Sequence, residues 1–288
     1  MESTRIIVTG PTSGIGKEIA RRLASDGAEV ILACRDVSRG EATASEISEQ
    51  TGAAEPAVIP VDTSRPASIH EFAREIERRY DRVDVLVNNA GVLSARRRTS
   101  ADGIELTFAT NVIGYYAMTG ELLDILRAGA SARIVNVAST FAGDVDLDDP
   151  QFQRRSYDGM QAYAQSKACD RMLTWAFARR LADTGITVNA MAPGLVTETK
   201  LYRDLPTEIR RQLERQPSRS IAQGADTAVW LADAAELQGT TARFYEQRAE
   251  KPCQFRDLEG EEKLWAICHA LSDHRSPAPR PATGADSQ

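Results

Sequence analysis

Tyr163 and Lys167 are the pair of side chains in this sequence whose types and spacing best fit acid–base chemistry. They stand four positions apart in a stretch of helical periodicity, and residues at that spacing share one face of a helix. A lysine ammonium beside a tyrosine hydroxyl favours the phenolate, so we expect it to lower the tyrosine pKa from about 10. The pattern predicts a general acid or base that works near neutral pH. Taken alone, the pair also fits a core tyrosine and a surface lysine at chance spacing.

A glycine-rich turn near the N-terminus predicts a site for the phosphates of a dinucleotide. Glycines stand at positions 10, 14 and 16, between a strand expected over residues 5–9 and a helix expected over 14–25. Glycine permits a tight turn and a close approach of backbone to a pyrophosphate, and the start of a helix offers free N–H donors to that anion. Because the loop lies directly between the first strand and the first helix, we expect it to hold a cofactor. The residues expected to do so are Gly10, Thr12, Ser13, Gly14, Ile15 and Gly16.

The end of the second predicted strand, at residues 29–34, bears on the choice between NAD(H) and NADP(H). Dinucleotide-binding folds usually carry an acidic residue there, which bonds the ribose 2′-hydroxyl. Here Arg35 occupies the turn and Asp36 follows it. A guanidinium is the natural partner of a 2′-phosphate, so the sequence favours NADP(H) over NAD(H). The alternative is that Arg35 is a solvated turn residue and Asp36 contacts the ribose, in which case NAD(H) is used.

Short apolar runs alternate with longer segments of helical period along most of the chain. Strands are expected over residues 5–9, 29–34, 56–61, 83–88, 133–137, 187–191 and 242–245. Helices are expected over 14–25, 38–50, 66–80, about 103–126, about 160–183, and around 206–215 and 225–235. This alternation predicts right-handed crossovers and an α/β fold, a Rossmann-type doubly wound parallel sheet with helices on both faces. We expect one domain over residues 1–274 and a disordered Pro-, Ala- and Ser-rich tail over 275–288.

Composition excludes several other classes of protein. The 288 residues are 42% hydrophobic and carry a net charge of −6, which favours neither nucleic acid nor an anionic membrane as a partner. The four cysteines lack CxxC spacing and there are only three histidines, so no metal site is expected. No apolar stretch approaches the ~20 residues of a membrane span, and no signal peptide is visible. We therefore expect a cytoplasmic protein.

Seven motifs in order make the sequence resemble the short-chain dehydrogenase/reductase superfamily. They are the TGxxxGIG run at 9–16, Asp62, the NNAG run at 88–91, Asn111, Ser139, the YAQSK run at 163–167, and Pro193-Gly194. The resemblance covers residues 5–245 and looks closest to the retinol-dehydrogenase-like and protochlorophyllide-reductase-like branch. Three features carry this narrower likeness, namely the LACRD run at 32–36, residues 100–111, and the 24-residue interval between Ser139 and Tyr163, which holds an acidic insert at 144–149.

The resemblance implies a role for each motif residue. Tyr163 would donate a proton to a carbonyl oxygen as hydride arrives, while Lys167 would hold the nicotinamide ribose and tune Tyr163. Ser139 would hydrogen-bond the substrate oxygen. Asn111, a residue of poor helix propensity in the middle of a predicted helix, would anchor a water that relays protons to Lys167. The remaining cofactor contacts implied are Asp62 and Thr63 at the adenine, Asn89, Ala90 and Gly91 at the adenosine, and Pro193, Gly194 and Val196 at the nicotinamide.

One departure from the family pattern concerns the segment after Pro193-Gly194. The usual PGxVxT pattern would place a threonine at position 198, but Glu198 stands there between Thr197 and Thr199. A shift of one residue would still place Thr199 at the carboxamide. We expect substrate specificity in residues 144–160, in residues 195–220 and after residue 239. The second of these would be a mobile lid with an apolar inner face, formed by Leu201, Tyr202, Leu205 and Ile209, or else an ordinary amphipathic surface helix.

The function expected from this reading is NADPH-dependent reduction of a ketone or aldehyde on a lipophilic or secondary-metabolite substrate. An NAD(P)-dependent alcohol dehydrogenase that works in the oxidative direction is the first alternative. A cofactor-binding regulator without turnover is the second, although Asn111, Ser139, Tyr163 and Lys167 are all present. A homodimer through helices around 110–125 and 160–180 is also conceivable, with Met172, Leu173 and Trp175 as outer apolar positions that would permit it.

Overall fold

Apolar runs of the sequence form the strands of one sheet in the computed structural model, which describes residues 3–129 and 131–272. The strands are β1 (Arg5–Thr9), β2 (Glu29–Cys34), β3 (Ala57–Pro60), β4 (Val85–Asn88), β5 (Arg133–Val137), β6 (Thr187–Ala192), β7 (Phe244–Glu246) and β8 (Ala249–Lys251). Their order is β3-β2-β1-β4-β5-β6-β7-β8. All neighbours are parallel except β7 and β8, which are antiparallel. The strand order reverses between β1 and β4, where doubly wound folds bind ligands at the carboxyl ends of the strands.

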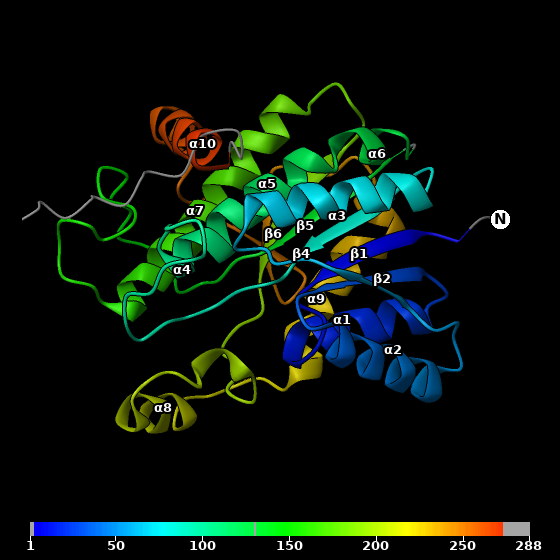
Figure 1. Ribbon diagram of the computed structural model, residues 1–288, viewed down its shortest axis with the longest axis horizontal. Coiled ribbons are helices and arrows are strands. Elements are labelled where there is room, and N and C mark those ends of the chain that lie inside the picture. Colours follow the sequence, from blue (N-terminus) through cyan, green and yellow to red (C-terminus); the bar gives the residue numbers. More distant parts are fainter. Residues whose placement is uncertain (1–2, 130, 273–288) are drawn as a thin grey trace, which may run out of the picture.

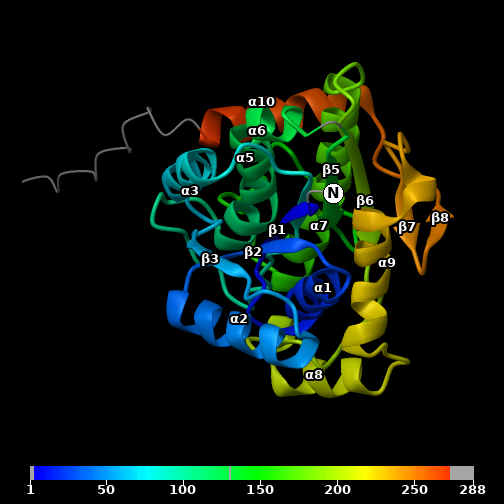
Figure 2. The same cartoon turned by 90° about the vertical axis from the view of Figure 1, so that its right-hand side faces the viewer.

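Helices cover both faces of the sheet (Figure 1). They are α1 (Gly14–Ser25), α2 (Val37–Thr51), α3 (Pro66–Arg79), α7 (Gly159–Arg180), α8 (Thr207–Glu214), α9 (Ile221–Asp233) and α10 (Leu258–Ser272), with shorter pieces between α3 and β5. Alternate strand residues point to opposite faces. Ile7 and Leu86 therefore join the core under α3, α7 and α10, whereas Ile6 and Val8 join the core under α1 and α9. Figure 2 shows these two helical layers on either side of the strands.

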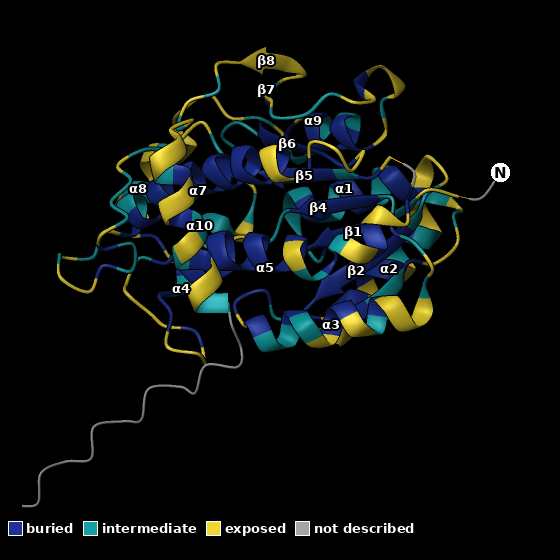
Figure 3. Ribbon diagram, turned by 90° about the horizontal axis from the view of Figure 1, so that it is seen from above, coloured by how far each residue is buried: buried dark blue, intermediate teal, exposed yellow. Residues whose placement is uncertain are grey.

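The helices that follow β2, β3 and β5 begin at residues suited to that place. Asp36 accepts a hydrogen bond from the backbone N–H of Arg39 and so caps α2, while Asp158 caps α7 in the same way. Pro66 stands in the first turn of α3, where its missing N–H costs little. Figure 3 shows the central strands and α7 as the most buried elements. The doubly wound parallel fold predicted from the sequence is confirmed.

The helix predicted over about residues 103–126 is confirmed in outline, but it begins at Leu106, contains a π-helical turn and is interrupted at Leu122. The segment consists of α4 (Leu106–Phe108), a π-helical turn η1 (Ala109–Ile113), α5 (Gly114–Glu121) and α6 (Leu123–Arg127). A Cβ on Gly114 would lie 2.5 Å from the carbonyl oxygen of Thr63, so the backbones approach here more closely than any other residue would allow. This contact with a distant loop cannot be read from the local sequence. The π turn carries Asn111, and such turns are frequent at functional sites.

The C-terminal part contains two elements that the sequence pattern did not predict, the short strand β8 and the long helix α10. Helix α10 packs on α7, and its Glu261 pairs with Arg179. Met172, Leu173 and Trp175 are 5%, 1% and 2% exposed, so the prediction that they form an outer apolar face is wrong. They belong to the core of this chain. The predicted tail at 275–288 lies outside the described residues.

Candidate active site

Tyr163 and Ser139 meet at the carboxyl end of the sheet. Tyr163 lies in the second turn of α7, and Ser139 follows the end of β5 by two residues. The two side chains are hydrogen-bonded, which favours the Tyr163 phenolate. The Ser139 hydroxyl oxygen also accepts a hydrogen bond of 3.0 Å from the backbone N–H of Phe141. This bond fixes the orientation of the hydroxyl, and the strand end thereby presents Ser139 to Tyr163.

Lys167 lies one helical turn beyond Tyr163 and is 3% exposed. Its ammonium donates 2.8 Å hydrogen bonds to the carbonyl oxygen of Val137 and to the carboxylate of Asp170. Asp170 is fully buried, and one of its carboxylate oxygens has no hydrogen-bond partner among the described residues. Burial raises the pKa of Asp170 to about 7, against the opposing effect of Lys167. Sequence reasoning missed this carboxylate, although a charged residue in the middle of an apolar helix was a visible signal.

The predicted effect of Lys167 on Tyr163 is wrong for this arrangement of side chains. The lysine nitrogen lies 5.9 Å from the centroid of the Tyr163 ring and is committed to Asp170 and Val137. Tyr163 is 9% exposed. Burial raises its pKa above the usual 10, and Tyr202 and Asp170 add to this, while the hydrogen bond from Ser139 only partly opposes it. The phenol is therefore held in its protonated, proton-donating form.

Asn111 fixes the loop that follows β4. Its side-chain oxygen accepts from the N–H of Val92 at 2.9 Å, and its amide nitrogen donates to the Val92 carbonyl at 3.1 Å and to the Ser166 hydroxyl at 2.9 Å. A Cβ on Gly91 would lie 3.6 Å from the Asn111 side-chain oxygen and 4.0 Å from the Lys167 nitrogen. Asn111 and Lys167 thus meet at Gly91. The role of Asn111 as a water anchor stays a prediction.

The glycine-rich loop and the loop after β4 are locked together. Gly10 and Gly14 have φ angles of +64° and +56°, which favour glycine. A Cβ on Gly16 would lie 2.3 Å from the side-chain nitrogen of Asn89 and 2.4 Å from the carbonyl oxygen of Gly10. That nitrogen donates to the carbonyl oxygen of Thr9 at 2.8 Å, and the Thr9 hydroxyl accepts from the N–H groups of Asn89 and Ala90 at 2.9 Å each. The result is a glycine cradle in front of α1.

The α1 end of this cradle suits an anion. Ser13 precedes α1, its hydroxyl makes no capping bond, and no acidic residue stands in the first turn of the helix. The carbonyl of the neighbouring residue, Thr12, accepts a 3.4 Å hydrogen bond from the guanidinium of Arg39. Ile15 contacts Gly224 from α1, so its side chain packs behind the loop. The start of α1 therefore has N–H groups without helical partners and an uncapped hydroxyl, the kinds of donor that a phosphate needs.

Two arginines and one aspartate lie after β2. Arg35 and Arg39 are both exposed, and Arg39 reaches the glycine-rich loop at Thr12. The Asp36 carboxylate accepts from the N–H of Arg39 at 3.1 Å as the cap of α2. This second arginine was missed in the sequence, where only Arg35 was noted. Arg39 lies four residues after Arg35 in α2, and only the fold places it next to the glycine-rich loop.

The turn after β3 holds Asp62 and Thr63, which the sequence predicts at the adenine. The Asp62 carboxylate accepts from the N–H of Ser64 at 3.0 Å and from its hydroxyl at 2.7 Å. Thr63 is buried and lies against Gly114 in the helix that carries Asn111. The hydrogen bonds and the contact with Gly114 therefore fix the shape of this turn.

The segment after β6 reaches the glycine-rich loop. Gly194 has a φ of +75°, and Pro193 precedes it directly. Val196 is 2% exposed and packs against Gly224. Thr199 donates from its hydroxyl to the Val196 carbonyl at 3.1 Å, and its methyl lies 3.2 Å from the Cβ that Gly14 lacks. Glu198 is exposed. The structure therefore brings Thr199, and not residue 198, to the cradle.

An apolar cover lies over Tyr163. Leu93, Tyr163 and Leu205 form a small buried cluster, and Leu201, Tyr202 and Ile209 are packed against it, together with Leu213 of α8. The predicted apolar inner face of residues 195–220 therefore faces Tyr163. An ion pair of 3.6 Å between Arg98 and Asp204 joins this segment to the loop after β4. The site has an apolar wall on its open side.

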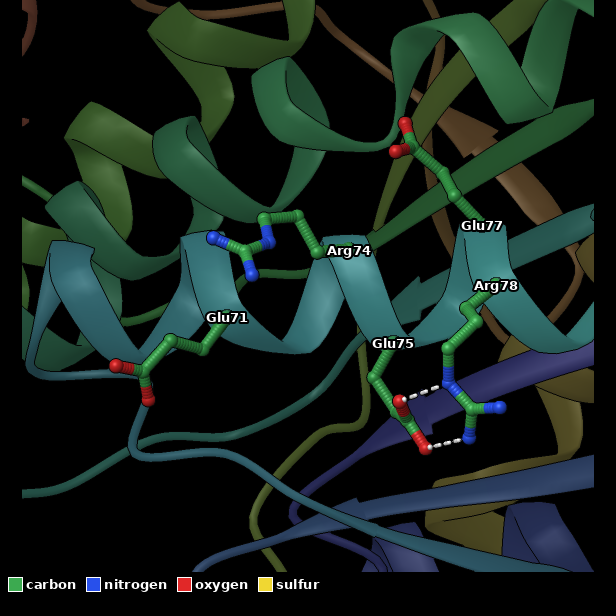
Figure 4. Close-up of a pocket in the computed structure, with 5 residues that line it drawn as sticks. All are labelled: Glu71, Arg74, Glu75, Glu77 and Arg78. Carbon is green, nitrogen blue, oxygen red and sulfur yellow. Dashed lines mark hydrogen bonds and ion pairs between the residues drawn. The ribbon is translucent and has the colours of Figure 1, made fainter.

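A shallow surface hollow on α3 has a different character. It is lined by Glu71, Arg74, Glu75, Glu77 and Arg78, all from one helix (Figure 4). Arg78 donates two 2.8 Å hydrogen bonds to Glu75. None of the predicted site residues lines this hollow, and its paired charges are typical of a solvated helix face.

Comparison with known proteins places the chain in a family. The sequence pattern of the family described as short chain dehydrogenase matches residues 4–210. Human retinol dehydrogenase 13 is 36% identical over 286 residues, covering 96% of this chain and 86% of that protein. A Streptomyces antibioticus protein named "Probable oxidoreductase" is 39% identical over 271 residues, covering 90% of this chain and 88% of that protein.

Solved structures give the same answer for the fold. A protein of Mycobacterium paratuberculosis, 28% identical, superposes with a TM-score of 0.74 and covers 96% of this chain and 95% of its own. A variant of actinorhodin polyketide ketoreductase with NADPH, 30% identical, has a TM-score of 0.66 and covers 84% and 94%. The chain belongs to the short-chain dehydrogenase/reductase superfamily and is an oxidoreductase. Within that superfamily it lies in the retinol-dehydrogenase-like branch, as the sequence predicted.

None of the helices at residues 3–129 and 131–272 is long and apolar enough to cross a membrane. Over the same ranges, no group of three or more His, Cys, Asp or Glu side chains is arranged to hold a metal ion.

Proposed function

We propose that the protein reduces a ketone or aldehyde with NADPH, and that Tyr163 donates the proton to the carbonyl oxygen. The observation that carries this proposal is the state of Tyr163, a buried phenol whose pKa is raised by its surroundings and which is hydrogen-bonded to Ser139. A phenol that keeps its proton suits the reductive direction. Oxidation of an alcohol would need the phenolate as a base.

The residues around the glycine cradle fit a nicotinamide dinucleotide. An added Cβ on Gly10, Gly14 or Gly16 would meet Ala90, Thr199 or Asn89, so glycine at these positions lets the glycine-rich loop pack closely against the segments after β4 and β6. The proposed contacts are those predicted from the sequence, namely residues 10–16 at the pyrophosphate, Asp62, Thr63 and Asn89–Gly91 at the adenosine, and Pro193, Gly194 and Val196 at the nicotinamide. When bound, this cofactor supplies the hydride.

The proposed division of labour at the carbonyl follows from the contacts. Ser139, held by the Phe141 N–H, orients the carbonyl oxygen beside Tyr163. Tyr163 transfers its proton to that oxygen. Lys167 has two of its three N–H donors committed, to Val137 and Asp170, which leaves one for the cofactor ribose at Gly91.

The preference for NADPH rests on charge at the end of β2. Arg35 and Arg39 are exposed beside the glycine-rich loop, and Asp36 is occupied as the cap of α2. Two guanidinium groups favour a 2′-phosphate, whereas a free carboxylate would favour the 2′-hydroxyl of NAD(H). Relatives are named for retinol and for a polyketide, and the cover over Tyr163 is apolar. We therefore propose a lipophilic or secondary-metabolite carbonyl.

A panel of aldehydes and ketones of increasing apolar size tests the proposal. Consumption of NADPH and of NADH would be followed by absorbance, with the wild type and with the double variant Arg35→Ser, Arg39→Ser. We expect kcat/KM with NADPH to exceed that with NADH, and the double variant to lose about tenfold or more with NADPH alone, since charged hydrogen bonds contribute about 1.5–3 kcal/mol each. Equal use of both cofactors would refute the NADPH assignment. A complete absence of turnover would favour a cofactor-binding regulator.

A further inference from the structure

Arg171 is a buried cation on α7 that none of the roles above uses. It is 3% exposed, and its guanidinium donates a hydrogen bond to the backbone carbonyl of Ser139. The guanidinium carbon lies 3.7 Å from the ring centroid of Phe244 in β7 and 5.6 Å from that of Phe255. Arg171 therefore connects the reactive serine with the C-terminal part of the chain.

Arg171 and Lys167 hold the same strand end. They stand four residues apart on α7 and so share a face of the helix. Lys167 donates to the carbonyl of Val137, and Arg171 donates to the carbonyl of Ser139, two residues further along the chain. Two cations from one helix thus hold the backbone at Val137 and at Ser139. The Phe141 N–H fixes the serine hydroxyl from the other side.

Stability does not explain an arginine at this position. No carboxylate among residues 3–129 and 131–272 lies within ion-pairing distance of Arg171. The Glu246 carboxylate acts on the Arg171 charge from further away, and the Arg171 Nε is buried with no hydrogen-bond partner among those residues. Burial lowers the pKa of Arg171 to about 10, so it still carries its charge at neutral pH. Burying an unpaired charge costs several kcal/mol, and an apolar side chain of similar size would fill this space between rings at lower cost.

We propose that Arg171 is a positioning residue for Ser139. It holds the backbone of residue 139 so that the hydroxyl faces Tyr163 and the carbonyl oxygen of the substrate. The inference rests on the role proposed for Ser139 above. Because a reacting group that shifts by about 1 Å can cost a hundredfold in rate, loss of this hold should act on turnover and leave cofactor binding unchanged.

The test is a double-mutant cycle on the full chain, with a carbonyl substrate from the panel. Arg171→Met removes the hydrogen bond and keeps the volume, Arg171→Lys keeps a donor, and Ser139→Ala removes the group acted upon. Arg180→Met is the matched control, because Arg180 also stacks on an aromatic ring, Trp265 at 3.8 Å, but from the far end of α7. The readouts are kcat, the KM for each substrate, NADPH affinity by fluorescence, and the melting temperature.

We expect Arg171→Met to lower kcat by about tenfold to a hundredfold. NADPH affinity should stay within about twofold, the melting temperature should not fall, and Arg171→Lys should recover part of the loss. In the Ser139→Ala background, Arg171→Met should change kcat by less than about twofold, because the arginine acts through the serine. An unchanged kcat in Arg171→Met, or the same fold-loss with and without Ser139, would overturn this inference alone. Absence of turnover in the wild type would overturn it together with the proposed function.

Discussion

Gly16→Ala should weaken both the fold and the cofactor site through a single added methyl group. That methyl would lie 2.3 Å from the Asn89 side-chain nitrogen and 2.4 Å from the Gly10 carbonyl oxygen, more than 1 Å inside ordinary contact. Asn89 would have to leave its hydrogen bonds to the carbonyls of Thr9 and Gly10. Two lost hydrogen bonds at about 1 kcal/mol each, plus overpacking of about 1–3 kcal/mol, outweigh the gain of about 1 kcal/mol from alanine in a helix. The net loss in the free energy of unfolding is about 2–4 kcal/mol.

Urea denaturation and NADPH fluorescence titration would measure the two effects. We expect Gly16→Ala to unfold at lower urea and to bind NADPH at least about tenfold more weakly, since the cradle moves. Gly120→Ala is the matched control, because Gly120 is exposed in α5 and no atom lies within 4 Å of its added Cβ. The control should gain about 0.5–1 kcal/mol of stability. A Gly16→Ala protein that resembles this control in both measurements would refute the reasoning about the cradle.

Two further predictions concern the buried carboxylate and the apolar cover. Burial raises the pKa of Asp170 to about 7 in the folded chain, so the folded form keeps a proton that the unfolded chain releases near 3.8. The free energy of unfolding should therefore fall as pH rises from 4 to 7, by up to about 1.4 kcal/mol per pH unit. Urea titrations should show that Asp170→Asn removes this dependence on pH. Equal slopes in the wild type and the variant would contradict the raised pKa of Asp170. Leu205 is 5% exposed beside Tyr163, and Leu205→Ala should raise the KM of an apolar carbonyl about tenfold through loss of about 1.5–3 kcal/mol of burial, with the KM of NADPH unchanged. A rise in both constants would place Leu205 outside the substrate site.

The sequence predicted those parts of the fold and site that depend on neighbours along the chain. Apolar runs such as Arg5–Thr9 and Arg133–Val137 became strands at the expected residues, because β-branched residues between turns leave few alternatives. The glycines at 10, 14 and 16 and the Tyr163–Lys167 pair are likewise recognised by their spacing along the chain. The placement of these motifs between strands and helices was therefore predictable.

Features that depend on contacts between distant segments were not predictable. The π turn at Asn111 is followed directly by Gly114, which packs closely against Thr63, some fifty residues earlier. The pKa of Tyr163 is raised mainly by its burial, in a cluster with Leu93 and Leu205 from separate loops. The sequence contains Asp170 and Arg171, but only the structure shows that they contact Lys167 and the carbonyl of Ser139.

Turnover of Tyr163→Phe tests the central claim most directly. The wild type and the variant would be compared with NADPH and the best carbonyl of the panel, and NADPH affinity would be measured in parallel. The account predicts that kcat falls by about a hundredfold to ten-thousandfold, the usual contribution of a general acid, while NADPH affinity stays within about twofold. Reduction of the carbonyl by Tyr163→Phe at the wild-type rate would contradict the assignment of Tyr163 as the proton donor.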